Sequence, residues 1–368
     1  MDISEPFRLF CSDKIWLEGD AVEQFRRIMR FPNLLAGAAF PDLHPGRGVP
    51  VGAAFLFEKR IVPALIGGDI GCGMTLWALD LPPRKLKIDR LIRSLTDEPE
   101  AKLRQTAGEL LRNRESSVPD PRHLLGTIGH GNHFVELLAV DDIRDAVRWK
   151  ALNLPDNGLL LLVHAGSRGY GETLWTEFAA VHGDGGVEAA SPAGRAYLEA
   201  HDRLRLWASF NRRLLAAVFL ALLGCGGREI LDNTHNSITE CGPDRWLHRK
   251  GAAEVRPGEP VLIAGSRGAH SFLVMPKAAP ETHLFSLAHG AGRKWTRQHA
   301  RARLKARYEH QALLKTGIGS RVVCPDRELL YEEAPEAYKN IDRVIEDLTA
   351  FGLIDVVAAL RPVLNCKP

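Results

Sequence analysis

Residues 159–169 read LLLLVHAGSRG. Five apolar residues follow Asn157-Gly158 without a polar interruption, a pattern typical of a short strand that is buried on both faces. The run ends in His164, and a glycine-rich turn follows at once. Similar apolar runs occur at 61–66, at 261–264 and in the stretch ending at Leu231. The sequence therefore predicts several buried strands with polar side chains at their ends.

Helical patterns separate these runs. Ser191-Pro192 begins one that extends to Gly224, with a capping residue and a proline at its start and a glycine after its end. We expect this helix to break near its middle. A second pattern begins at Pro335 and places apolar residues at helical spacing (341, 344, 345, 348) before Gly352. No repeat or linker interrupts the chain, which predicts one intertwined α/β domain over residues 1–368.

Composition excludes several classes of protein. With 45% hydrophobic and 25% charged residues the chain is expected to be globular, and a net charge of +3 does not by itself indicate a polyanionic partner. Its six cysteines are scattered without a C-x-x-C pair, which argues against a disulfide framework or a zinc knuckle. The first twenty residues lack the pattern of a signal or transit peptide. The longest apolar run, 214–223, is shorter than the roughly 20 residues that cross a bilayer. We therefore expect a cytoplasmic protein with no membrane partner.

One pattern recurs along the chain: an apolar run, a His, Asp or Cys, and adjacent glycines. In open α/β sheets ligands bind beyond the carboxyl ends of strands, where glycines allow the backbone to approach them closely. We expect these ends to converge on one site. The segments are LIGGDIGCG (65–73), GTIGHGNHF (126–134), LLLLVHAGSRG (159–169), REILDNTHNS (228–237) and FSLAHGAGR (285–293).

Five side chains in these segments form a candidate metal centre: Asp69, Cys72, His133, His164 and His235. A carboxylate, a thiolate and three imidazoles are a mixed hard and soft ligand set that suits manganese, zinc or iron. Any one histidine taken alone is more often an ordinary core or surface residue. A lone cysteine equally fits a small buried hydrophobe. The shared setting of all five favours the metal hypothesis.

His289 stands in HGAGR, where glycines leave room for a phosphate and Arg293 can neutralise it. This pattern suits a nucleophile that forms a phosphoramidate with a nucleotide, although a plain turn histidine fits equally well. The pentapeptide AGSRG occurs at 165–169 and at 264–268. Such turns form anion-binding nests to which Arg168 and Arg267 can add charge, or they are simple tight turns.

Residues 293–307 contain seven lysines and arginines and no acidic residue, with Trp295 and Tyr308 nearby. The segment fits either a phosphate-binding surface for nucleic acid or the solvated face of a helix.

Taken together, these motifs resemble the RtcB family of RNA ligases, and they follow the family's order from about residue 40 to the end. The motifs are PDLHPGRGVPVGAA (41–54), GGDIGCG, LGTIGHGNHFVE (125–136), HAGSRG, THN, HRKGA (248–252), GSRGAHS (265–271), HGAGR, EEAPEAYK (332–339) and RPVLNCKP.

The resemblance implies an α/β (α+β) fold of mixed β-sheets with flanking helices around a central metal and nucleotide site. It implies two manganese ions (Mn2+) and GTP as cofactors. The implied reaction joins an RNA 3′-phosphate or 2′,3′-cyclic phosphate to a 5′-hydroxyl through a histidine–GMP intermediate.

The resemblance also assigns roles to residues. The five candidate ligands match the family's metal ligands, with Cys72 bridging both ions, and His289 matches the guanylylated histidine. Arg168, Lys250 and Arg293 match basic residues near phosphate or RNA. The positions that match those holding the guanine nucleotide are Asn132, Glu136, Ser266, Ser271, Tyr338 and Lys367.

The chain departs from the family pattern in two ways. It is shorter than typical full-length members, and Arg267 stands where a methionine is expected. Such features resemble the short branch that is linked to a peptide-release-factor homologue and to RNA repair. Two alternatives remain open at this point: a metal-dependent phosphoesterase that only opens cyclic phosphates, and a non-catalytic RNA-binding module.

Overall fold

The computed structural model describes residues 7–96, 99–112, 119–277 and 279–367, so residues 1–6 of the N-terminal segment lie outside it. Within these residues the largest sheet has eight strands, and all its pairs are antiparallel except β16 with β17. Its order is β13 (Val261–Ile263), β14 (Ser271–Pro276), β17 (Ile354–Cys366), β6 (Phe134–Ile143), β7 (Leu159–Ala165), β5 (Gly73–Leu79) and β9 (Gly227–Thr234), with β16 (Arg321–Val323) beside β17.

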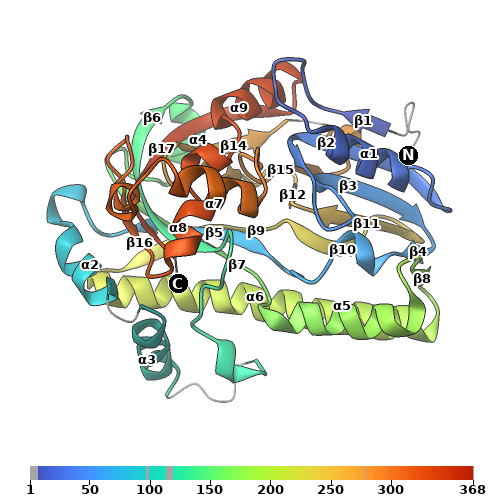
Figure 1. Cartoon of the computed structure of the whole chain (residues 1–368), viewed down its shortest axis with the longest axis horizontal. Coiled ribbons are helices and arrows are strands. Elements are labelled where there is room, and N and C mark those ends of the chain that lie inside the picture. Colours follow the sequence, from blue (N-terminus) through green and yellow to red (C-terminus); the bar gives the residue numbers. More distant parts are fainter. Residues whose placement is uncertain (1–6, 97–98, 113–118, 278, 368) are drawn as a thin grey trace.

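A second sheet of five strands mixes one parallel pair, β1 with β2, with antiparallel pairs. Its order is β1 (Phe7–Leu9), β2 (Leu34–His44), β3 (Val51–Glu58), β11 (Arg245–Lys250) and β10 (Asn236–Glu240). Two short ribbons are β12 (Ala252–Glu254) with β15 (Ser286–Ala288), and β4 (Arg60–Ile61) with β8 (Val187–Glu188). The two large sheets lie next to each other, with helices packed around them (Figure 1).

The helices are α1 (Gly19–Ile28), α2 (Ile88–Thr96), α3 (Pro99–Leu111), α4 (Ala146–Ala151), α5 (Gly169–His182), α6 (Pro192–Leu223), α7 (Arg297–Lys305), α8 (Arg327–Glu332) and α9 (Ile341–Ala350). Helices and mixed sheets together make an α+β fold, which confirms the expected fold class.

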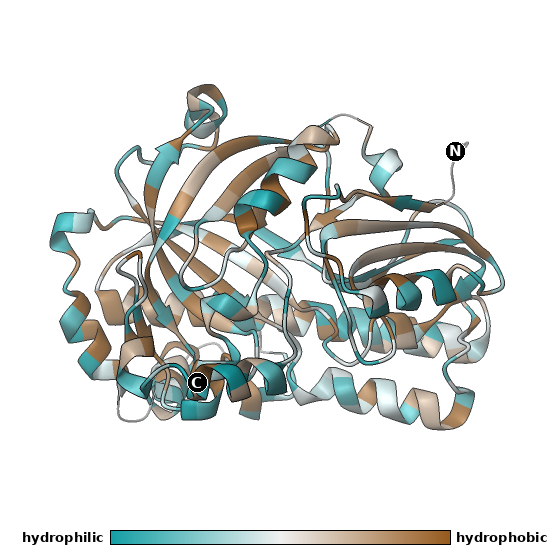
Figure 2. Cartoon of the chain, turned by 45° about the horizontal axis from the view of Figure 1, so that its top comes forward, coloured by the Kyte–Doolittle hydropathy of each residue, from teal (hydrophilic) through white to brown (hydrophobic). Residues whose placement is uncertain are grey.

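Strand β7 is the predicted doubly buried strand, and every one of its residues is buried. Leu161 and Val163 pack against α6 on one face. Leu160 and Leu162 point into a cluster built mainly from the sheet's own strands, to which Trp149 of α4 also belongs. The large sheet curls far enough that β13 and β9, at its two ends, lie close together. Figure 2 shows the apolar strands of this curled sheet, with the helices outside it. Because both faces are covered, the strand needs no polar alternation.

Helix α6 has the predicted ends. The Ser191 side chain accepts a hydrogen bond from the Gly194 N–H, and Gly224 adopts the left-handed conformation. The expected break near its middle was wrong: α6 is continuous, because no glycine or proline interrupts residues 195–223. Of the described helices, only α6 has the length and apolar composition to cross a membrane. Half of its most apolar window is buried within the protein, which also fits a core helix.

Two other expectations need correction. The run at 61–66 is mostly a 3-10 turn rather than a strand, because Pro63 cannot donate a ladder hydrogen bond. Pro335 likewise opens only a 3-10 turn, and α9 begins at Ile341, where the Asn340 side chain caps the Asp342 N–H.

Candidate functional site

The five predicted metal ligands lie together at one end of strands β5, β6, β7 and β9. Met74 and Phe134 both pair with His164, and Gly73 pairs with Thr234. The expectation that every segment ends a strand was wrong, because 65–73 and 126–134 precede β5 and β6. In an antiparallel sheet the start of one strand lies beside the end of its neighbour, so the segments still converge.

Close contacts link the five side chains in the order Asp69, His133, Cys72, His164, His235. His133 Nε2 lies 3.1 Å from Asp69 Oδ2 and 3.2 Å from Cys72 Sγ. His164 Nε2 lies 3.2 Å from the same sulfur and 3.3 Å from His235 Nε2. Cys72 therefore stands in the middle of the series, with imidazoles on both sides.

This cluster has the chemistry of a metal site. Cys72, His133 and His164 are buried, and their ligand atoms lie within 4.8 Å of one another. Burial lowers the pKa of His164 and of His235 well below the ordinary value, so both imidazoles are neutral and can offer a lone pair. Burial, and then the adjacent Asp69 carboxylate, raises the pKa of the Cys72 thiol. A bound cation would reverse that shift and stabilise the thiolate, so the donor set fits a metal.

Buried groups behind the cluster hold it in place. Arg212 pairs with Asp232 at 2.7 Å and donates to the carbonyls of Gly71 (2.7 Å) and Ala165 (3.0 Å). These carbonyls belong to the two segments that carry Cys72 and His164. A Cβ at Gly166 would lie 2.2 Å from Asp69 Oδ1, so a larger residue there would displace this carboxylate.

His289 directly follows β15, and its imidazole lies beside the cluster: its ring centroid is 4.6 Å from that of His235. Its Nδ1 lies 2.8 Å from Asp42 Oδ2, and its main-chain N–H donates to the same oxygen at 3.2 Å. Asp42 is fully buried. Lys339 donates to the carbonyls on either side of this aspartate, those of Pro41 and Leu43. The imidazole is therefore oriented by a rigidly held carboxylate.

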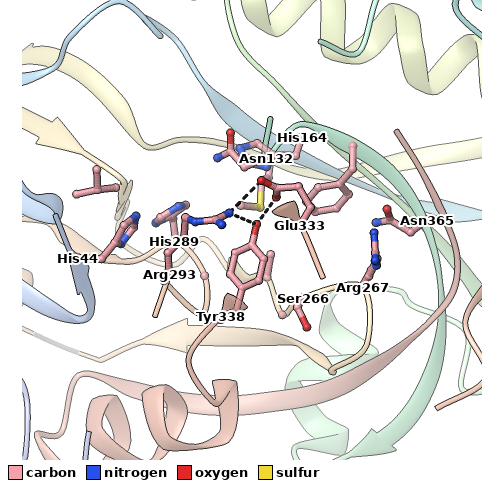
Figure 3. Close-up of a pocket in the computed structure, with 18 of the residues that line it drawn as sticks. His44, Asn132, His164, Ser266, Arg267, His289, Arg293, Glu333, Tyr338 and Asn365 are labelled. Carbon is pink, nitrogen blue, oxygen red and sulfur yellow. Dashed lines mark hydrogen bonds and ion pairs between the residues drawn. The ribbon is translucent and has the colours of Figure 1, made fainter. Parts of the chain in front are cut away.

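A cavity of about 240 Å³ opens next to His289. Figure 3 shows His44 and His289 at one end of it, Arg267 and Asn365 at the other, and Tyr338 between them. Five lysine or arginine side chains line it against one carboxylate, that of Glu333. The five are Lys250, Arg267, Arg293, Arg297 and Lys367. This excess of positive charge favours an anionic ligand.

Glu333 joins three cavity residues in one network. Its carboxylate lies 3.0 Å from Arg293 Nη1 and 3.7 Å from Lys367 Nζ, and it accepts a hydrogen bond from the Tyr338 hydroxyl. Burial alone would raise the pKa of Glu333, but Lys367 and Arg293 lower it to about 2. Glu333 therefore stays ionised and holds these side chains in fixed positions.

The residues predicted to hold the nucleotide divide into two groups. Asn132, Ser266, Arg293, Tyr338 and Lys367 line the cavity. Glu136 and Ser271 are not among the lining residues, although each contacts one. Asn365 Nδ2 donates to Glu136 Oε1 at 2.9 Å, and the Ser271 hydroxyl accepts from the Gly265 N–H at 3.0 Å.

The buried carboxyl of Glu136 predicts that the stability of the protein depends on pH. Burial raises its pKa from 4.5 to about 8, and Asn365 and Lys367 offset this only in part. Between pH 4.5 and about pH 8 the Glu136 carboxyl keeps its proton in the folded protein and loses it in the unfolded chain. The free energy of unfolding therefore decreases as pH rises through this range. In the native protein this decrease in the free energy of unfolding should amount to about 1 kcal/mol per pH unit, and we expect Glu136→Gln to abolish it. Urea unfolding at several pH values checks this, with exposed Glu109→Gln as the control. Equal slopes in the native protein and Glu136→Gln would contradict it.

The predicted basic groups have different surroundings. Arg168 Nη1 lies 3.3 Å from His133 Nδ1, behind the metal cluster. In the 293–307 segment, Arg293 and Arg297 line the cavity, whereas Arg301 on α7 pairs with Glu328 of α8 at 3.4 Å. The guanidinium of Arg303 stacks over Trp295, 4.9 Å from the ring centroid. The segment is therefore partly cavity wall and partly a helix surface.

Sequence reasoning missed four residues that organise the site: Asp42, Arg212, Glu333 and Asn365. Three of them lie within quoted motifs, PDLHPGRG, EEAPEAYK and RPVLNCKP, but nothing in the local pattern indicated their partners. Arg212 lies inside α6 and carried no signal.

Comparison with known proteins identifies the family of this chain. A family model described as tRNA-splicing ligase RtcB matches residues 24–118 and 109–368. The RNA-splicing ligase RtcB2 of Escherichia coli is 42% identical over 368 residues, covering 99% of this chain and 96% of that protein. The tRNA-splicing ligase RtcB of Archaeoglobus fulgidus is 28% identical, covering 94% and 90% respectively. The RNA-splicing ligase RtcB of Mycobacterium tuberculosis is 29% identical, covering 90% and 96%. The chain therefore belongs to the RtcB family of RNA ligases.

Proposed function

We propose that this RNA ligase depends on GTP and manganese and works through a histidine–GMP intermediate at His289. One observation carries the proposal: the His289 imidazole stands between a five-donor metal cluster and a cation-rich cavity. A nucleotide whose base enters the cavity would place its phosphates between His289 and the cluster. A binding module has no need for this combination, which favours an enzyme.

The contacts of His289 select the attacking atom. Nδ1 donates its proton to the Asp42 carboxylate, so Nε2 presents the lone pair. Nε2 attacks the α-phosphorus of GTP, a P–N bond forms, and pyrophosphate leaves. Asp42 acts as a positioning residue that holds the tautomer and stabilises the positive charge that develops on the ring.

Asp69, Cys72, His133, His164 and His235 would hold the metal. Asp69 and His133 on one side of Cys72, and His164 and His235 on the other, would supply the donors for two manganese ions. Bound manganese would supply positive charge that neutralises phosphate oxygens during transfer. Lys250 and Arg293, which line the cavity, would add to this charge.

The guanylate then passes from His289 to an RNA 3′-phosphate, breaking the P–N bond and forming a phosphoanhydride. The 5′-hydroxyl of a second RNA end attacks the 3′-phosphorus and releases GMP. A 2′,3′-cyclic phosphate would first be hydrolysed to the 3′-phosphate. We further propose a role in RNA repair in the cytoplasm, linked to a peptide-release-factor homologue, on the basis of the chain's resemblance to the short branch of the family.

A joining assay with defined RNA ends tests the proposal. We expect ligation of 3′-phosphate or 2′,3′-cyclic phosphate ends to 5′-hydroxyl ends only when GTP and manganese are both present. A 5′-phosphate acceptor is the control and should not be joined. Opening of the cyclic phosphate without GTP and without joining would identify the protein as a phosphoesterase instead. RNA binding with neither reaction would identify a non-catalytic module.

A further inference from the structure

Lys339 is a buried lysine that connects two segments of the site. It is only 7% exposed. Its ammonium donates to the carbonyls of the residues before and after Asp42, at 3.0 and 2.6 Å. Its main-chain N–H donates to the carbonyl of Gly292 at 3.0 Å, three residues after His289. This one residue therefore holds both the end of β2 that carries Asp42 and the turn that carries His289.

The charge of Lys339 matters because the Asp42 carboxylate has few other partners. Asp42 is fully buried, and its Oδ2 contacts both the imidazole and the main-chain N–H of His289. Its Oδ1 is buried without a hydrogen-bond partner among the described residues, and a Cβ at Gly52 would lie 2.8 Å from it. A buried carboxylate needs a nearby positive charge to stay ionised. The ammonium of Lys339, bonded on both sides of this residue, supplies that charge.

The electrostatics of Lys339 agree with this pairing. Burial lowers the pKa of its ammonium, and the Asp42 carboxylate is the largest influence that opposes the decrease. Each charge therefore stabilises the other. Lys339 is not among the residues that line the cavity, so its effect on a bound nucleotide must pass through Asp42 and His289.

We infer that Lys339 is a positioning residue for the reaction of His289 with GTP, because its ammonium keeps the Asp42 carboxylate ionised and fixed in place. This inference rests on the proposed function. When Nε2 of His289 bonds to the α-phosphorus and pyrophosphate leaves, the ring keeps its Nδ1 proton and gains a positive charge. An ionised Asp42 stabilises that charge, whereas a protonated Asp42 does not.

The rate of covalent labelling of the full chain by GTP tests this role. Lys339→Met keeps the length of the side chain and removes its charge. We expect the rate constant of labelling to fall about ten- to hundredfold. The GTP concentration that gives half of the maximal rate should change by less than about twofold, because Lys339 does not line the cavity. Lys339→Arg should recover part of the rate, and Lys150→Met, at an exposed lysine of α4, is the matched control.

A double variant separates this role from a general effect on folding. In Asp42→Asn the carboxylate on which Lys339 acts is absent, so adding Lys339→Met should lower the rate constant no further. A misfolded fraction lowers the amount of protein that is labelled but leaves the rate constant of the folded fraction unchanged.

Four results would overturn the inference. The first is an unchanged rate constant in Lys339→Met, and the second is a loss that multiplies in the double variant. The third is an increase in the half-saturating GTP concentration that accounts for the whole effect, because it would identify a nucleotide contact. The fourth is absence of labelling in the native protein, which would also refute the proposed reaction at His289.

Discussion

Replacing His289 by alanine is expected to abolish covalent labelling of the protein by GTP and to lower RNA joining by about 10³-fold or more. The imidazole lines the cation-rich cavity, and its ring centroid lies 4.6 Å from that of His235 in the metal cluster. Without it no P–N bond forms. Incubation with GTP labelled at the α-phosphate and with manganese should give an acid-labile, alkali-stable adduct in the native protein and none in His289→Ala.

Two further variants sharpen this test. His182→Ala, at the exposed end of α5, is the matched control and should label normally. Asp42→Asn should still label, but about 10²- to 10⁴-fold more slowly, because an amide can hold the wrong tautomer of His289. Equal labelling of the native protein and His289→Ala would place the nucleophile elsewhere.

For the proposed two-ion site, replacing Cys72 by alanine is expected to remove both ions and, with them, all joining activity. Its sulfur lies 3.2 Å from His133 Nε2 and 3.2 Å from His164 Nε2, so it is the one donor shared by both sides of the cluster. Asp69→Asn and His235→Ala each alter one side only, and we expect each to retain one ion. Metal content of protein dialysed against manganese, measured beside ligation, checks this pattern.

Cys225→Ala is the control for the loss of a thiol. Cys225 follows the C-terminal end of α6, is partly exposed and is not one of the five cluster residues. It should keep full metal content and activity. Two ions retained in Cys72→Ala would contradict the shared role of this cysteine, and one ion lost in Cys225→Ala would point to a general effect on folding.

Local patterns in the sequence were sufficient for several features. The uninterrupted apolar run 159–163 predicted β7, because a strand covered on both faces needs no polar alternation. Ser191 and Gly224 predicted both ends of α6, because capping depends on the few residues at each terminus. The recurring motif selected all five cluster residues, since glycines beside a ligand leave a local signature. The roles of these residues, and the unity of residues 1–368 as one domain, stay predictions.

Tertiary structure decided the rest. It arranged the strands antiparallel, so that the starts of β5 and β6 meet the ends of β7 and β9. It brought Asp42 to His289 across 247 residues and left Nε and Nη1 of Arg267 buried without a hydrogen-bond partner. The physical reason is the separation along the chain over which each kind of interaction acts. Caps and periodicity act within a few turns of the chain, whereas these contacts depend on sheet order and register, which no local pattern contains.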